Sequence, residues 1–503
     1  MPVEEAFVAL PLDSLADAAL TRANELGADH VDVRVERIRT RSVEIRDTEL
    51  AGTHDGSLVG LAVRVLHDGT WGFAATPDLT LDEARATAER AVAVARVSHP
   101  LRSGPAQLAP EPAARGTWVS QYEIDPFDVD VADTVGLLTD YAQRVLDDPR
   151  VDHVTASLQQ VRESWYYADS SGSRTIQQRV WVHPQVEALA VDADAGGFET
   201  MRTLAPPVGR GFEYVTGADG VHDWADELAA IPDLLAERMR APSVHPGRYD
   251  LVIEPSNLWL TIHESIGHAT ELDRALGFEA NYAGTSFATP DQLGTLRYGT
   301  SIMNVTGDRT VPHGLATVGW DHEGVAAQSW DIVRDGVLVG YQLDRSSATL
   351  LPHAQPRSNG CAYADSPTHI PIQRMANVSL APGPDGTSAI DLIGEVEDGL
   401  YVVGDKSWSI DQQRFNFQFT AQRFYRIRDG QLVGQVKDAA YKGRTPDFWG
   451  SLTGLGDAST FVLGGATNCG KAQPGQVAPV SHGAPTTLFR GVNVLSTVAE
   501  GRR

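Results

Sequence analysis

Apolar and polar residues follow two different periods along the first 240 residues, and each period predicts one kind of secondary structure. Apolar residues three and four positions apart predict helices, because they then share one helix face. Such segments cover 12–26, 80–97, 131–146 and 224–239. Runs in which about every second residue is apolar predict strands over 31–35, 41–46, 58–65, 154–161, 164–169, 175–182, 185–192 and 196–204. The order helix, strands, helix thus occurs twice, which predicts two α/β modules.

Two local signals refine this first part of the chain. Asp13 stands at the start of the first helical segment, where an Asp side chain can cap free backbone N–H groups. The tetrapeptide Thr-His-Asp-Gly at 53–56 has the composition of a turn. We therefore expect the chain to reverse between the strand segments 41–46 and 58–65.

The second part of the chain has a different pattern, dominated by short strands and glycine-rich turns. It follows segment 241–247, whose two prolines and one glycine are typical of a linker. Asp-Gly pairs at 335–336 and 429–430 stand between strand-like runs, which indicates hairpins. The sequence therefore predicts an α+β protein with an N-terminal α/β two-module domain, 1–240, and a mainly β C-terminal domain, 247–503.

Composition and charge exclude several classes of function. The chain has 503 residues, of which 42% are hydrophobic, so it can bury a large core. Its net charge of −25 argues against binding to nucleic acid or to an anionic membrane surface. Its two cysteines, Cys361 and Cys469, lack CxxC spacing and are expected to be reduced thiols. With an acidic N-terminus and no long apolar segment, the protein is expected to be cytoplasmic.

The strongest chemical signal is the hexapeptide His263-Glu264-Ser265-Ile266-Gly267-His268, which follows an apolar, helix-compatible run. Two neutral imidazoles can hold Zn²⁺, and a neighbouring carboxylate can take a proton from its water. The spacing differs from the common zinc protease helix, in which the two histidines lie four apart. With 15 histidines in the chain, such a pair can also arise by chance.

The five-residue spacing makes a geometric prediction. On a regular helix, side chains five apart point about 140° away from each other, so the two imidazoles cannot share a metal. A single π-type turn would return them to one face. Gly267 fits a deformed backbone, although glycine costs about 1 kcal/mol in a helix interior. We expect a helix over about 256–272 that is distorted near Gly267.

Two histidines need a third protein ligand to make a catalytic zinc site. The nearby candidates are Glu271, Asp273 and Glu279, and the remote ones are Cys469 and Cys361. A soft thiolate suits Zn²⁺, although a free cysteine is most often simply a buried thiol. Cys469 lies in a glycine-flanked loop that allows close backbone approach, so the residues alone rank it only slightly ahead.

Further motifs along the chain resemble the TldD/PmbA (TldD/TldE) metalloprotease family over nearly its full length. The residues that carry this resemblance are 34–37, 71–76, 263–268, 363–367, 374–378, 397–401, 416–419, 467–471 and 482–485. No single segment is specific for the family, but this many matching segments in the same order are specific for it.

The resemblance implies that His263, His268 and Cys469 bind zinc, with Glu264 as the catalytic acid/base. It implies peptidase activity on unfolded or extended peptides inside a cavity enclosed by a dimer. In heterodimeric members, a non-catalytic TldE/PmbA-type subunit lacks the metal motif. This chain has the whole motif, so we expect the catalytic TldD-type subunit, with 1–240 enclosing substrate and forming the dimer.

Alternatives remain open at this point. The site could serve a metal-dependent amidase that processes a modified peptide or natural product, because pocket shape decides substrate choice. The chain could also be a non-catalytic scaffold subunit, although the intact motif argues against this. A closed structural zinc site usually has four protein ligands, and only three are offered here. For the donor to the reacting carbonyl oxygen, His482 and Tyr363 are candidates, but each is more simply a structural or substrate-lining residue.

Overall fold

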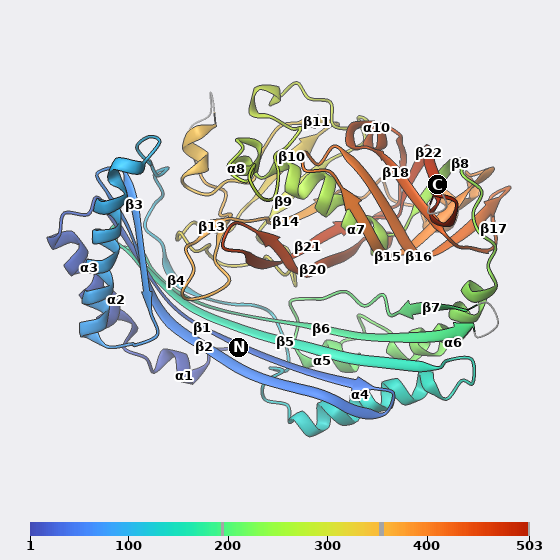
Figure 1. Cartoon of the computed structure of the whole chain (residues 1–503), viewed down its shortest axis with the longest axis horizontal. Coiled ribbons are helices and arrows are strands. Elements are labelled where there is room, and N and C mark those ends of the chain that lie inside the picture. The colour runs from blue at the N-terminus through green and yellow to red at the C-terminus, as the bar shows by residue number, and fades with distance from the viewer. Residues whose placement is uncertain (193–195, 352–356, 501–503) are drawn as a thin grey trace.

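A computed structural model describes residues 1–192, 196–351 and 357–500 of the chain. The N-terminal part is built on one long, curved sheet, and the C-terminal part lies against the concave side of that sheet (Figure 1). The fold is mixed α and β, as the sequence predicts. None of the helices in the described segments is long and apolar enough to cross a membrane.

The N-terminal sheet has seven strands. They are β1 (His30–Arg46), β2 (Glu49–His67), β3 (Thr70–Thr76), β4 (Arg115–Val119), β5 (His153–Asp169), β6 (Arg174–Asp192) and β7 (Gly197–Arg202). Their order is β3-β2-β1-β5-β6-β4, with β7 paired to β6. All neighbours are antiparallel except β4 and β6, which run parallel.

Helices cover the two ends of this sheet and create two separate cores. They are α1 (Glu5–Val8), α2 (Leu12–Glu25), α3 (Leu81–Ser98), α4 (Val131–Leu146), α5 (Phe212–Thr216) and α6 (Trp224–Arg240). One core joins α2 and α3 to β1 and β2, and the other joins α4 and α6 to β5 and β6. The two predicted modules are therefore two helical layers on one shared sheet.

Several local predictions in this region are wrong. Segment 53–56 is not a turn but the middle of β2, and the chain reverses at Asp47 instead, with φ of 57°. The middle of β2 is exposed, so polar residues and glycines are tolerated there. Three pairs of predicted strands are each one strand: 31–35 with 41–46 in β1, 154–161 with 164–169 in β5, and 175–182 with 185–192 in β6. Asp13 does not cap α2; it accepts a hydrogen bond from the Tyr166 hydroxyl at 2.5 Å.

The C-terminal part is organised around a sheet that closes on itself. Its ring consists of β8 (Gly247–Ile253), β15 (Asp398–Ile410), β16 (Asn416–Arg428), β18 (Ala439–Arg444) and β22 (Thr487–Ser496), extended by β17 (Gln431–Val436) and β19 (Leu452–Leu455). Both predicted Asp-Gly hairpins are confirmed, joining β16 to β17 and β10 (Ser329–Arg334) to β11 (Val337–Leu338). In each turn both central residues have positive φ, as this turn type requires.

Smaller elements complete this part and surround helix α7 (Pro255–Ile262). A second sheet has the order β11-β10-β9-β14, with β9 (Val305–Asp308) and β14 (Asn377–Leu380). Two ribbons are formed by β12 (Ala362–Tyr363) with β13 (Ile372–Gln373), and by β20 (Val462–Lys471) with β21 (Gln476–Ala484). The short helices are α8 (Leu272–Ala275), α9 (Ala389–Gly394), α10 (Thr445–Trp449) and α11 (Thr497–Glu500). Helix α7 packs against β14, β15, β20 and β21, so it is held at the centre of this part.

Candidate metal centre

The helix that carries the hexapeptide changes its winding at the expected place. Helix α7 starts after Glu254, whose side chain accepts a hydrogen bond from the Ser256 amide. It continues as one π turn over His263–Gly267 and one 3₁₀ turn over His268–Thr270. The amide of His268 bonds to the carbonyl of His263, five residues back. The predicted distortion is confirmed, and it turns both imidazoles to the same side.

Gly267 contributes close packing rather than the backbone freedom that the sequence indicated. Its φ is −51°, an ordinary helical value, so the turn does not depend on the conformational freedom of glycine. A Cβ atom at this position would lie 2.5 Å from Sδ of Met375, which is closer than real contacts allow. The glycine therefore lets the π turn pack directly against Met375.

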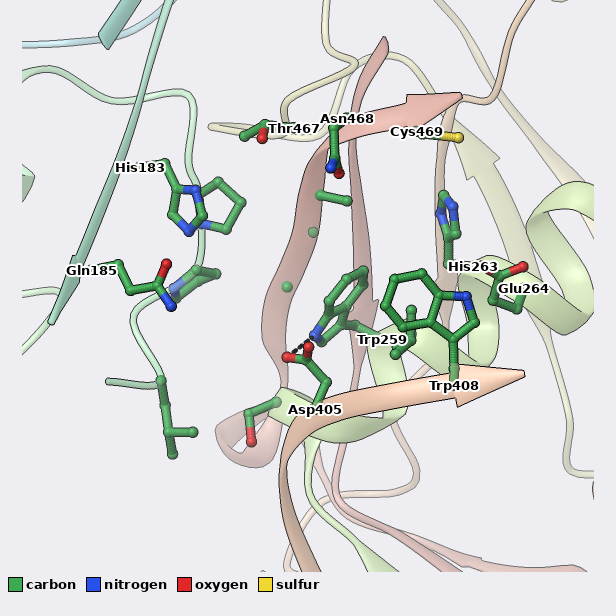
Figure 2. Close-up of a pocket in the computed structure, with 18 of the residues that line it drawn as sticks. His183, Gln185, Trp259, His263, Glu264, Asp405, Trp408, Thr467, Asn468 and Cys469 are labelled. Atoms are coloured by element: carbon green, nitrogen blue, oxygen red, sulfur yellow. Dashed lines mark hydrogen bonds between the residues drawn. The ribbon is translucent and has the colours of Figure 1, made fainter. Parts of the chain in front are cut away.

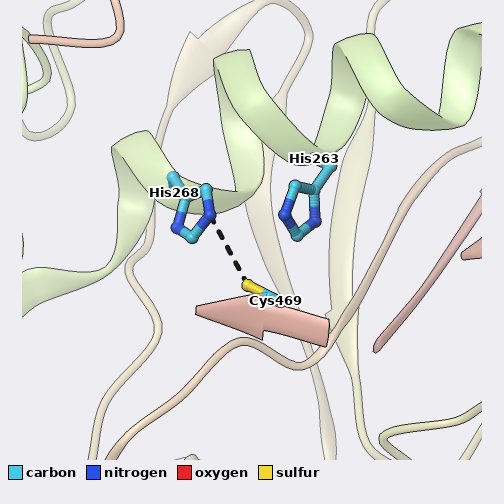
Figure 3. A group of neighbouring side chains, drawn as sticks. All are labelled: His263, His268 and Cys469. Carbon is cyan, nitrogen blue, oxygen red and sulfur yellow. Dashed lines mark hydrogen bonds between the residues drawn. The ribbon is translucent and has the colours of Figure 1, made fainter. Parts of the chain in front are cut away.

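Three potential ligand atoms meet on one side of this turn. The ring centroids of His263 and His268 are 4.7 Å apart, and Sγ of Cys469 lies 3.5 Å from Nε2 of His268. The ligand atoms of all three residues lie within 4.8 Å of one another, and each residue is at least 95% buried (Figure 3). The pairing of β20 with β21 shifts register between Ala466 and Cys469, and this bulge places Cys469 beside the helix.

The partners of the two imidazoles determine which ring nitrogens are free. Nδ1 of His482 lies 2.9 Å from the carbonyl oxygen of Val378, so it carries the proton. Burial holds the pKa of His482 well below its usual value, so this ring is neutral and its Nε2 is an acceptor. Nε2 of His482 lies 2.7 Å from Nδ1 of His263, which therefore donates. Since burial also lowers the pKa of His263, its Nε2 keeps a free lone pair.

His268 is oriented by a carboxylate. Its Nδ1 lies 2.8 Å from Glu271, whose other oxygen accepts from Nζ of Lys471 at 3.2 Å. Burial would raise the pKa of Glu271, but Lys471 and His268 outweigh this and hold it well below the usual range. The ionised Glu271 accepts the Nδ1 proton, and Nε2 of His268 is left free towards Cys469. Burial lowers the pKa of His268, so this imidazole too is neutral near pH 7.

The donor set fits a zinc ion. Burial would raise the pKa of the Cys469 thiol, but His268 and Arg374 outweigh burial and place it below the usual value. Two free imidazole nitrogens and a sulfur that ionises readily are the ligands Zn²⁺ prefers. Each imidazole also has the outer hydrogen bond that typically fixes a metal-binding ring. Three protein donors would leave a fourth position for water or substrate.

The other candidate ligands lie outside this group. Glu271 supports His268, while Asp273 accepts from Lys471 at 2.7 Å, and Glu279 accepts from the backbone amide of Ala472 at 3.2 Å. Cys361 is fully buried elsewhere, and burial raises the pKa of its thiol to about 12. Among the described residues, the cluster of potential metal ligands therefore contains Cys469 and not Cys361.

Neither sequence candidate for a donor to the reacting carbonyl is free for that role. Both ring nitrogens of His482 are engaged, as described above. The hydroxyl of Tyr363 donates to Glu163 at 3.3 Å in a buried cluster with Arg179, and Tyr363 does not line the cavity beside the histidines.

Arg414, which the sequence did not single out, forms an ion pair with Glu264. Glu264 is 5% exposed and lines the cavity together with His263 and Arg414. Arg414 lies in the turn 411–415 between β15 and β16. The only signal in the sequence is an arginine in a polar hairpin turn, which is typical of an ordinary solvated surface.

A cavity of about 530 Å³ opens beside the ligand group, and both parts of the chain line it. His183 and Gln185 project from β6 on one wall, while Trp259 and Trp408 face the cavity from α7 and β15 (Figure 2). Segment 464–470 of β20 forms a further wall. A molecule in this cavity would contact the N-terminal sheet and the candidate ligands at once.

Two models of one known protein family match this chain. A family model described as PmbA/TldA metallopeptidase C-terminal domain matches residues 246–496, and one described as PmbA/TldA metallopeptidase domain 1 matches residues 31–95. The chain belongs to the PmbA/TldD metallopeptidase family.

Relatives of this PmbA/TldD protein span nearly its whole length. A metalloprotease of Methanothermobacter thermautotrophicus is 29% identical, over 93% of this chain and 96% of the relative. A zinc metalloprotease TldD homolog of Saccharolobus solfataricus is 24% identical, over 94% of this chain and 98% of the relative. The crystal structure of TldE from Thermococcus kodakarensis shares the fold, with a TM-score of 0.70, 14% identity, and coverage of 95% of this chain and 99% of that one.

Proposed function

We propose that this protein is a zinc-dependent peptidase that hydrolyses amide bonds of unfolded or extended peptides. His263, His268 and Cys469 hold the zinc ion, and Glu264 is the general base and acid. The observation that carries this proposal is the meeting of three buried donor atoms within 4.8 Å, beside a carboxylate in a cavity. The name of the Saccharolobus solfataricus relative supports the choice of zinc.

Each of these residues has a separate role in amide hydrolysis. When bound, Zn²⁺ supplies the Lewis acidity that acidifies water and polarises a carbonyl group. Glu264 takes the proton of the attacking water at its carboxylate and returns it to the leaving amine. General acid–base catalysis of this kind typically contributes about 10²–10⁴-fold. His482 and Glu271 keep the two imidazoles in the tautomer that leaves Nε2 free.

The wall made by β20 supports an extended peptide as substrate. Among the described strands, β20 pairs only with β21, so its other edge lacks a strand partner. This edge belongs to the same segment, 464–470, that lines the cavity. An extended peptide can satisfy such an edge through its main chain, which requires no particular sequence. The indole rings of Trp259 and Trp408 offer apolar contact to its side chains.

We further propose a dimer that encloses the site, either of two copies or with a non-catalytic TldE/PmbA-type subunit. Residues 1–240 would form the domain that encloses substrate and makes the dimer, and 247–503 the metallopeptidase domain. The shared fold with TldE supports a partner of this kind, and the wall that β6 contributes supports enclosure. Two free, buried cysteines fit a reducing cytoplasm.

The test combines metal content with products. Purified protein should carry about one zinc per chain, the stoichiometry of a single three-ligand site. Mass spectrometry should show cleavage of an unfolded peptide library, measured with and without a TldE-type subunit. Glu264→Gln should keep zinc and lose cleavage, while the matched surface control Glu395→Gln keeps both. Full activity without metal, or cleavage restricted to one modified peptide, would contradict the general zinc peptidase.

A further inference from the structure

The backbone at Arg414 is held in an unfavourable conformation beside the candidate base. Its φ is +62°, in the left-handed region that non-glycine residues rarely adopt. Asp411 holds the turn, because its carboxylate accepts from the amides of Phe415 at 2.8 Å and Asn416 at 3.0 Å. Thr445 adds a hydrogen bond to the Arg414 carbonyl at 2.7 Å. Strain of this kind persists where the surroundings enforce it, and it clusters at active sites.

The guanidinium group of Arg414 has donors left over. One terminal nitrogen pairs with Glu264. Its Nε–H is buried and has no acceptor among the residues that the structure describes. A buried donor without a partner is costly. Since Arg414 also lines the cavity, a bound substrate is the molecule that could supply an acceptor to its guanidinium.

A simple structural ion pair explains this arrangement poorly. The ion pair with Glu264 engages one terminal nitrogen of Arg414 and leaves its Nε–H without an acceptor among the described residues. The ion pair gains a catalytic role if the guanidinium contacts two groups, Glu264 on one side and the reacting carbonyl on the other. It then holds the carboxylate next to the carbon atom that water attacks. His482 and Tyr363 leave this role vacant, because their polar atoms are engaged elsewhere.

We propose that Arg414 is a catalytic residue that donates hydrogen bonds to the carbonyl oxygen of the scissile amide as negative charge develops there. This inference rests on the proposed peptidase function. A new C–O bond forms between water and the carbonyl carbon, and the C=O π pair moves onto the oxygen that faces Arg414. The water proton goes to Glu264. The C=O bond then re-forms, the C–N bond breaks, and Glu264 protonates the leaving amine, while Arg414 stays protonated throughout.

Kinetics of Arg414 variants test this role against a structural one. Arg414→Gln should lower kcat by about 10²–10³-fold, the usual cost of losing one oxyanion donor, with KM nearly unchanged. Arg414→Lys should fall between this variant and the wild type, because it restores the charge but not the forked geometry. The matched control Arg490→Gln removes an ion pair with Asp250 and should leave both constants unchanged. A rise in KM alone would overturn the proposal.

Binding of two peptide analogues provides a readout that does not depend on turnover. One is a phosphonate peptide, whose tetrahedral anionic group imitates the reacting centre. The other is a reduced-amide peptide of the same sequence, which has no carbonyl oxygen at that position. Arg414→Gln should weaken the phosphonate by about 10²–10³-fold and leave the reduced amide unchanged. Equal weakening of both analogues would overturn the proposal.

Two further controls separate the possible failures. Zinc content and Tm of Arg414→Gln and Arg414→Lys should match the wild type; loss of zinc in both would assign Arg414 to the structure of the site instead. In Arg414→Gln, kcat should fall equally for peptides with a free and with an amidated C-terminus. A fall confined to peptides with a free carboxylate would instead show that Arg414 binds the C-terminus of the substrate. A wild type that cleaves no peptide refutes the proposed function itself, whereas a cleaving wild type with a fully active Arg414→Gln refutes only this inference.

Discussion

The ring of His482 is hydrogen bonded to the ring of His263, with 2.7 Å between Nε2 of the former and Nδ1 of the latter. His482 thereby sets the tautomer of His263 from a strand 219 residues later in the chain. We expect His482→Ala to lower zinc affinity by about 10–100-fold, the usual effect of losing such an outer hydrogen bond. Titration against a competing chelator measures this. His245→Ala, at an exposed position, is the control, and an unchanged affinity in His482→Ala would remove this role.

The two cysteines should respond differently to substitution. Cys469→Ala removes a proposed ligand and should abolish tight zinc binding, because two imidazoles alone hold the ion weakly. Cys361→Ala should keep one zinc per chain and cost about 1 kcal/mol of unfolding free energy, a typical value for a point substitution. Metal analysis and urea denaturation measure the two effects. Loss of zinc in Cys361→Ala but not in Cys469→Ala would show that Cys361 is the ligand.

Gly267→Ala tests the close packing of the π turn. The new Cβ would collide with Sδ of Met375, so we expect a loss of about 1–3 kcal/mol in unfolding free energy, with weaker zinc binding. Met375→Ala in the same chain should recover part of the loss, which a double-mutant cycle would reveal as coupling. Gly136→Ala in α4 is the matched control. Its Cβ meets open space, so it should stabilise the protein by up to about 1 kcal/mol.

His183 should make the protein sensitive to mild acid. Burial lowers the pKa of its imidazole from the usual value of 6.5 to about 4. The unfolded chain therefore binds the proton more tightly, so stability is complete above about pH 6.5 and falls as the pH drops towards 4. At 1.36 kcal/mol per pKa unit, this single group accounts for a loss of about 3 kcal/mol. His183→Gln should make the unfolding free energy less dependent on pH between these values. The exposed control His245→Gln should keep the pH dependence of the wild type. An unchanged slope in His183→Gln would contradict the assignment.

Elements that depend on local pattern were predicted well from the sequence. The expected helix 131–146 coincides with α4, and both Asp-Gly pairs form hairpins. These signals are local, because helix periodicity and turn residues act over a few positions. The error at 53–56 has the opposite origin. Whether a polar, glycine-containing segment turns or extends as part of β2 depends on its pairing with β1, which lies outside that segment.

In the candidate site too, the features set by nearby residues were predicted from the residues themselves, and those set by distant residues were not. The five-residue spacing of His263 and His268 was sufficient to predict the π turn, because helix geometry alone relates spacing to direction. Residue chemistry ranked Cys469 only slightly ahead of Cys361, and the family resemblance then favoured Cys469 clearly. In the structure, the β20 bulge brings Cys469 to within 3.5 Å of His268.

The sequence by itself therefore determined the alternation of helices and strands in the N-terminal part, two hairpins of the C-terminal part, the distortion of the metal-site helix and the types of donor available. Each of these depends on residues close together in the chain. Only the tertiary structure decided which distant groups act together. It joined His482 to His263 and Arg414 to Glu264, and it placed the β6 wall across the cavity from α7. The physical reason is that hydrogen bonds and ion pairs act over a few ångströms, and strand pairing brings residues hundreds of positions apart within that distance.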